Sequence, residues 1–113
     1  MFSLNSSNHF EYYSKPCDMR KGFDSLCGIV CNELGREATN GEVFIFINRS
    51  RNTIKLLHWE TDGLVIYHKR LEKGTFSEPT IGVGTTQMRW PELVLMLAGI
   101  KTVSLIRKPR YSL

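Results

Sequence analysis

The chain has 113 residues, 42% of them hydrophobic and 23% charged, which predicts one folded domain and excludes wholesale disorder. Fifteen Lys and Arg against eleven Asp and Glu give a net charge of +4, which suits an anionic partner such as nucleic acid. The same charge is also common in small domains as an aid to solubility. The polar N-terminus does not have the features of a signal peptide, and no apolar run approaches the roughly 18 residues of a membrane span. We therefore expect a cytoplasmic protein with reduced cysteines and no membrane partner.

A short strand and a helix are the first predicted elements. Residues 10–13 are an aromatic run that is typical of a strand. A helix is predicted for residues 19–34, because apolar side chains recur there at helical spacing along one face: Phe23, Leu26, Cys27, Val30 and Leu34. Asp18 is the expected N-cap of this helix, and Gly35 is the expected terminating glycine.

The middle of the chain has the pattern of three consecutive strands. Residues 43–47 are β-branched and aromatic throughout, which predicts a strand covered on both faces. Residues 53–59 and 64–70 follow, and Asp62-Gly63 between them is a strong hairpin signal. These strands predict an antiparallel β-meander that is too apolar to stand alone, so the helix of residues 19–34 is expected to cover one face.

The last third of the chain begins with an expected long loop over residues 71–87, with room for one short strand. Trp90-Pro91-Glu92 then opens a second helix, in which Pro91 suits the first position. Its expected inward side chains are Leu93, Met96, Leu97 and Ile100. A final strand at residues 102–106 is a further option. Together the elements predict an α+β fold: an antiparallel β-meander packed against an amphipathic helix, plus a short C-terminal helix.

The residues that could support catalysis or metal binding are scattered. His58 and His68 are expected on opposite faces of the hairpin, because side chains alternate along a strand. Cys27 and Cys31 are one helical turn apart, but without further ligands nearby they are expected to be small buried hydrophobes. Most carboxylates fall in turns and helix starts, and there is no G-x-S-x-G elbow. We therefore predict no enzyme activity, no metal and no cofactor.

The candidate site is instead a set of basic residues: Arg20, Lys21, Arg49, Arg51, Lys55, Lys69, Arg70 and Lys73. By strand parity Lys55 and Arg70 share a face with His68, at the end of the hairpin away from Asp62-Gly63. That end could meet the turn that carries Arg49 and form a patch for phosphates. The alternative is that basic residues at strand ends only keep an edge from aggregating, and the sequence leaves both open.

Several of these segments resemble a known family. Residues 18–26 read DMRKGFDSL and are similar to the DMRKGFDGL opening of the TnpB-type accessory proteins of the insertion-sequence family numbered sixty-six. The resemblance continues through GEVFIF, NRSR, IKLL, WETDGL and YHKRLEKGTF, and residues 90–100 resemble the closing helix of the family. Ser25 replaces a glycine of the family pattern, and His58 stands where some relatives carry a second aromatic residue.

The resemblance covers about residues 10–100 and implies a small, non-catalytic accessory protein of transposition. Residues 1–9 are then a flexible leader and residues 101–113 a basic tail of one domain, 1–113. The partners that it implies are DNA of the mobile-element ends and the transposase proteins of the same element. One hypothesis is DNA binding through the basic residues; the other is a protein–protein adaptor without DNA contact, with an exposed apolar patch around Trp90 or Tyr67. The sequence makes no prediction of oligomeric state.

Overall fold

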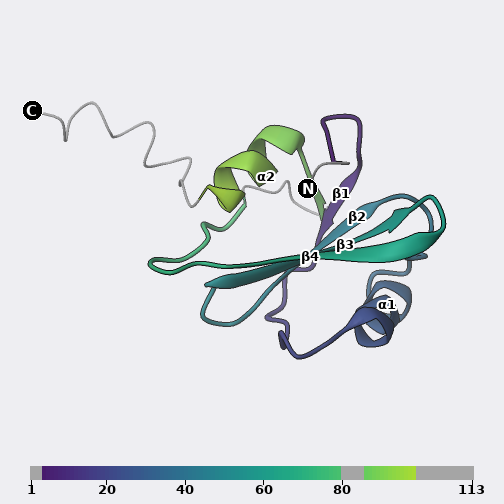
Figure 1. Cartoon of the computed structure of the whole chain (residues 1–113), viewed down its shortest axis with the longest axis horizontal. Coiled ribbons are helices and arrows are strands. Elements are labelled where there is room, and N and C mark those ends of the chain that lie inside the picture. The colour runs from purple at the N-terminus through teal and green to yellow at the C-terminus, as the bar shows by residue number, and fades with distance from the viewer. Residues whose placement is uncertain (1–3, 80–85, 99–113) are drawn as a thin grey trace, which may run out of the picture.

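The computed structural model describes residues 4–79 and 86–98, which form one sheet with a helix on each side (Figure 1). This arrangement confirms the predicted α+β class. Within the described part of the chain, no helix is long and apolar enough to cross a membrane. The predicted strand at residues 102–106 and the tail at 101–113 lie outside the described residues. In chain order the elements are β1 (Phe10–Tyr12), α1 (Phe23–Asn32), β2 (Val43–Ile47), β3 (Thr53–Glu60), β4 (Gly63–Arg70), β5 (Gln87–Met88) and α2 (Trp90–Leu97).

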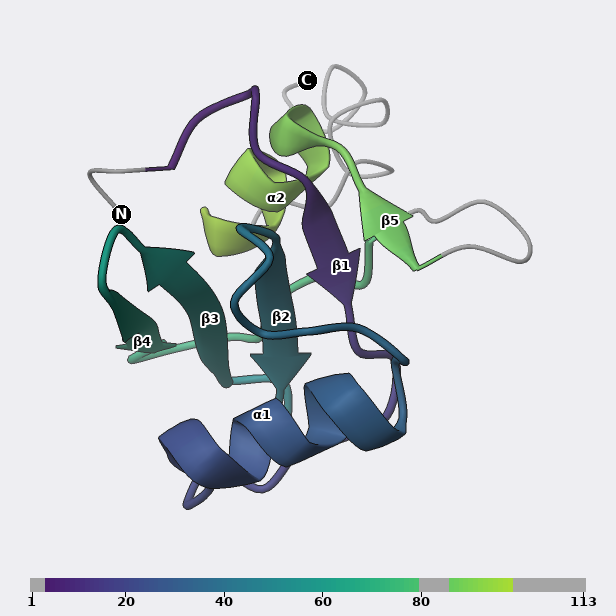
Figure 2. The ribbon, with the colours of Figure 1, turned by 90° about the vertical axis from the view of Figure 1, so that its right-hand side faces the viewer.

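The five strands of the sheet lie in the order β4-β3-β2-β1-β5. The predicted meander is confirmed, because β2 pairs antiparallel with β3 and β3 pairs antiparallel with β4. Figure 2 shows β1 beside β2 with both arrows in the same direction, and this pair is the parallel one. A parallel pair needs a crossover connection, and here the connection contains α1, which covers one face of the sheet.

The hairpin between β3 and β4 turns one residue earlier than predicted. Glu60 pairs with Gly63, so the turn residues are Thr61 and Asp62, and Thr61 takes the left-handed backbone at φ 52°. This correction moves each cross-strand partner by two residues and leaves every side chain on its predicted face. Lys55 now lies directly opposite His68.

The face of the sheet under α2 is the larger part of the apolar core. Leu93, Met96 and Leu97 of α2 are buried against it, as predicted, while Ile100 lies outside the described residues. Pro91 is the second residue of α2 rather than the first, because the helix begins at Trp90. The sheet and its loops contribute the remaining buried side chains of this cluster: Phe10, Tyr12, Val43, Ile45, Ile47, Ile54, Leu56, Phe76 and Met88.

The face under α1 departs further from the prediction. The helix begins at Phe23 with Gly22 as N-cap, so it is four residues shorter at this end than expected. Asp18 is not the cap; its carboxylate accepts the backbone N–H of Arg20 instead. Phe23 is 48% exposed, and Leu26, Ile29 and Val30 form the buried stripe.

The cysteines also differ from expectation. Cys17, which lies before the helix, is the buried one, at 4% exposure. Cys27 is half-buried beside the core, whereas Cys31 is exposed, so the prediction of burial for Cys31 is wrong. The described residues contain no group of three metal-ligating side chains.

Candidate nucleic-acid interface

Two loops that carry predicted site residues lie at the same end of the sheet, on the left of Figure 1. The backbone N–H of Leu71 donates to Asn52 O at 2.8 Å, and the N–H of Phe76 donates to Arg51 O at 2.7 Å. These contacts join the loop after β4 to the turn after β2. We call this region the basic end, defined by Arg20, Lys21, Arg49, Arg51, Lys55, Arg70 and Lys73.

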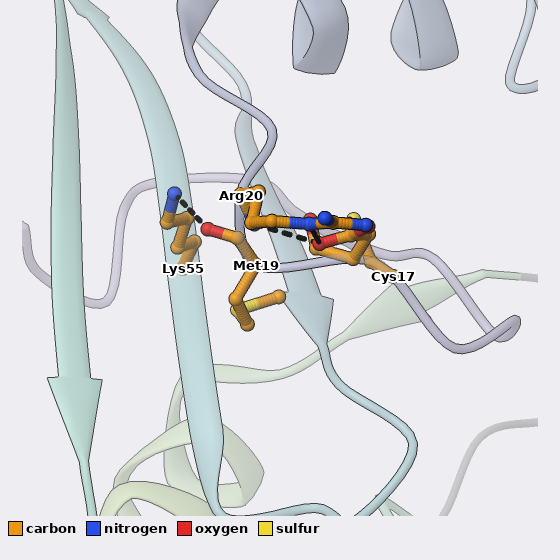
Figure 3. A network of polar contacts seen from close by, with 5 residues as sticks. Cys17, Met19, Arg20 and Lys55 are labelled. Atoms are coloured by element: carbon orange, nitrogen blue, oxygen red, sulfur yellow. Dashed lines mark hydrogen bonds and ion pairs between the residues drawn. The ribbon is translucent and has the colours of Figure 1, made fainter.

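Lys55 brings a third segment to the basic end. Its Nζ donates to the backbone carbonyls of Met19 at 2.7 Å and Lys21 at 2.8 Å, and Figure 3 shows the first of these contacts. Lys55 is only 8% exposed, so the structure does not support the expectation that it meets phosphate. It is a positioning residue: it fixes residues 18–22 above β3, beside the strand that carries His68 and Arg70.

Arg20 lies on this fixed segment with its side chain 90% exposed. Its guanidinium binds the Asp18 carboxylate, with Nη2 2.7 Å from Oδ2 and Nε 3.1 Å from both oxygens (Figure 3). Hydrogen bonds from the Arg20 side chain and backbone hold the pKa of Asp18 down at about 2. The carboxylate is therefore ionised at neutral pH and offsets part of the positive charge of Arg20.

Two further predicted site residues are tied to backbone carbonyls. Arg51 donates from Nε to Phe76 O at 3.1 Å, and its Nη1 lies 3.5 Å from a Glu78 carboxylate oxygen. Lys69 points to the α2 face and donates from Nζ to Leu97 O at 2.8 Å, at the C-terminal end of α2. A cation there satisfies a helix-terminal carbonyl and complements the helix dipole. Both side chains hold loops and helix ends together, which strand parity alone could not reveal.

The exposed remainder of the predicted set is Arg49, Arg70 and Lys73, with Lys21 half-buried. Within the described ranges none of these four side chains forms an ion pair. Arg49 also borders a hollow of about 460 Å³ between the turn after β2 and the loop before α1. Sequence reasoning missed this hollow, because it needs the contact between two loops that are distant in sequence. Its other lining residues are Pro16, Cys17, Asp18, Met19, Asn48 and Ser50.

The pKa of His68 is affected by the positive charges at the basic end. Burial lowers its pKa below the ordinary value of 6.5, and the neighbouring charges of Lys55 and Arg70 lower it further. His58 lies on the other face of the sheet, as predicted, because it pairs with Val65 while His68 pairs with Lys55. The two histidines therefore do not form an acid–base pair.

The chain is thus a small α+β domain that carries a positively charged surface at one end of its sheet. The chain matches the model of the family described as IS66 Orf2 like protein over residues 10–107. It belongs to this family and is an IS66 Orf2-like accessory protein of IS66 transposition, which confirms the resemblance found in its motifs. The family is generally not characterised as catalytic, and the absence of enzyme activity stays a prediction for this chain.

Two relatives from Sinorhizobium fredii (strain NBRC 101917 / NGR234) span most of the chain. The uncharacterized protein y4jC is 28% identical over 96 residues, which cover 85% of this chain and 82% of the relative. The uncharacterized protein y4hO is 32% identical over 83 residues, which cover 74% of this chain and 72% of the relative. No solved structure matches.

Proposed function

We propose that this accessory protein binds DNA of its mobile element through the exposed residues of the basic end: Arg20, Lys21, Arg49, Arg70 and Lys73. One observation carries the proposal. Three segments far apart in sequence are fixed at one end of the sheet, and each presents basic side chains there. Lys55 and Arg51 hold the segments and Arg20 is shared with Asp18, whereas Lys21, Arg49, Arg70 and Lys73 form no ion pair within the described residues.

Phosphate is the ligand that this chemistry fits. Arginine guanidinium groups donate in a fork that matches phosphate oxygens, and lysines add charge without strict geometry. Contacts of this kind position a protein on a duplex and carry no sequence information by themselves. The proposal therefore commits to backbone contact, with affinity that falls steeply as salt rises.

Fluorescence anisotropy of a labelled duplex that carries the element's terminal repeat, against a scrambled duplex, tests the proposal at several salt concentrations. The double variant Arg49→Gln with Arg70→Gln is expected to weaken binding and to reduce the slope of log affinity against log salt by about 0.9 for each lost contact. Arg89→Gln is the matched control, because Arg89 is 80% exposed at the N-terminal end of α2 and outside the basic end.

Absence of binding at low salt overturns the proposal, and so does an equal loss in Arg89→Gln. Tighter binding to the terminal repeat than to the scrambled duplex at every salt adds sequence recognition. Equal binding to both duplexes would indicate that the protein contacts only the DNA backbone and does not recognise the sequence.

The adaptor hypothesis has less support from the exposed surface. Trp90 is half-buried and lies against the ring of Phe10, with ring centroids 5.7 Å apart, and Tyr67 packs against the α2-side core. Both side chains are half-buried, so the predicted apolar patch around them is only partly exposed. In the described ranges the exposed large apolar side chains are Phe23, Val65 and Val94, on three different elements. Salt-resistant capture of the element's transposase by the purified protein would revive the adaptor hypothesis.

A further inference from the structure

The outer edge of β4 has the features of a pairing surface. β4 is the last strand of the sheet and pairs with β3 through eight consecutive residues, from Gly63 to Arg70. No described segment pairs with its other side. β5, at the opposite edge, has only two residues.

The direction of the backbone groups of β4 follows from one hydrogen bond. Leu71 N–H donates to Asn52 O at 2.8 Å, so these two residues form a hydrogen-bonded pair just beyond the strand. In an antiparallel ladder such pairs alternate with non-hydrogen-bonded ones, so the odd-numbered residues of β4 bond to β3. The outward N–H and C=O groups therefore belong to Leu64, Ile66, His68 and Arg70.

This edge has few of the devices that usually prevent strand addition. Proteins protect edges with prolines, bulges, inward-pointing charges or very short strands. β4 contains no proline, its register with β3 is continuous, and it is eight residues long. Two basic residues, Lys69 and Arg70, lie near the end of β4. The side chain of Lys69 does not protect the edge, because it binds the end of α2 instead.

We propose that a second copy of this chain pairs antiparallel along this edge, with Ile66 of each copy opposite the other on a two-fold axis. Outward backbone groups on even-numbered residues allow only registers that place even residues opposite even ones. In the Ile66 register, Leu64 lies opposite His68, and Arg70 extends past Gly63 of the other copy to its turn residue Asp62. This inference does not rest on the proposed DNA binding, but both use Arg70, so pairing of the two copies and contact of Arg70 with phosphate would compete.

Charge complementarity favours this register over the one centred on Tyr67. Asp62 and Arg70 are both exposed, and two-fold symmetry forms their ion pair twice. The neighbouring register, centred on Tyr67, places Asp62 opposite Glu72, so like charges meet instead. On the other face of the Ile66 register, Val65, which is 41% exposed, lies opposite Tyr67 in an aromatic and β-branched cross-strand pair.

Sedimentation equilibrium over a range of protein concentrations tests the proposal. The wild-type chain is expected to form a reversible dimer. Asp62→Arg alone and Arg70→Asp alone each turn two attractive pairs into two repulsive ones, so each variant is expected to raise the dimer dissociation constant about tenfold or more. Arg49→Asp is the matched control, because it makes the same change of charge at the basic end but away from the β4 edge.

An equimolar mixture of the Asp62→Arg chain and the Arg70→Asp chain separates this geometry from misfolding. In the mixed dimer both ion pairs are attractive again, so the mixture is expected to dimerise as the wild type does. A wild-type chain that stays monomeric overturns the proposal and leaves the edge to another partner or to residues 99–113. A dimer that is insensitive to either variant, or a mixture no tighter than its components, also overturns it.

Discussion

The two faces of the sheet differ in what they bury. Under α2 the buried side chains are apolar or aromatic apart from His58, and Phe10, Leu56 and Leu93 are almost inaccessible to solvent. Under α1 the apolar side chains share the face with two buried ionisable ones, Glu11 at 0% exposure and Lys55 at 8%. Burial of an unpaired charge is costly, so each of these groups needs polar partners. The difference indicates that one face stabilises the fold and the other positions loops.

The partners of the two buried charges are the segments on either side of α1. Glu11 lies 3.5 Å from Nε of Arg36 and accepts the hydroxyl of Thr86, while Arg36 also binds Glu42 at 2.9 Å. Lys55 holds the carbonyls of the segment before α1. The loop before the helix and the loop after it are thus fastened to the sheet by charge as well as by apolar packing.

The largest effect is expected from the apolar face. Leu93→Ala removes a fully buried side chain between α2 and the sheet and leaves a cavity, so the free energy of unfolding should fall by about 2–5 kcal/mol. Chemical denaturation monitored by circular dichroism measures the loss. Val94→Ala, on the exposed side of the same helix, is the control and should change stability little. Equal effects from both changes would contradict the assignment of this face as the main source of stability.

The substitution Lys55→Met tests the contribution of the α1 face of the sheet. The substitution keeps much of the apolar stem but leaves the carbonyls of Met19 and Lys21 without their donor, so we expect a loss of about 1–3 kcal/mol. The more specific result is a local one: NMR signals of residues 18–22 should show greater motion, while those of α2 stay unchanged. DNA affinity should fall as well, although Lys55 itself is buried. An unchanged segment 18–22 would show that Lys55 does not position it.

Lys69→Met is the matched change on the α2 side. Lys69 donates to a single carbonyl at the end of α2, and its side chain is half-buried, so we expect a smaller loss of about 0.5–1.5 kcal/mol. Hydrogen exchange should become faster in the last turn of α2 and not in residues 18–22. Two results would contradict the different roles of the two lysines. One is a loss of stability as large as that of Lys55→Met, and the other is faster hydrogen exchange in both segments.

Local sequence patterns predicted most elements but not the contacts between distant segments. The alternation and composition of β2, β3 and β4 were sufficient for the meander, and Pro91 with the apolar spacing after it was sufficient for α2. The start of α1 was predicted four residues early, because Lys55 holds residues 18–22 in a non-helical path. The same contact explains why Lys55 was assigned to phosphate: its partner is a backbone carbonyl 34 or 36 residues away, which no local period encodes.

The smallest predicted effect concerns His68, between Lys55 and Arg70. Since its pKa in the folded chain lies below the ordinary 6.5, the unfolded chain binds this proton more readily. Stability should therefore decrease as pH falls through 6.5 toward the folded value. Arg70→Gln removes one neighbouring charge, so the pKa of His68 should rise part of the way back, because burial remains the larger cause. NMR titration of the imidazole protons measures both values, with Arg89→Gln as the control that leaves them unchanged. A pKa at or above 6.5 in the wild type would contradict the clustering of positive charge beside His68, whereas a rise on addition of duplex DNA would place phosphate there.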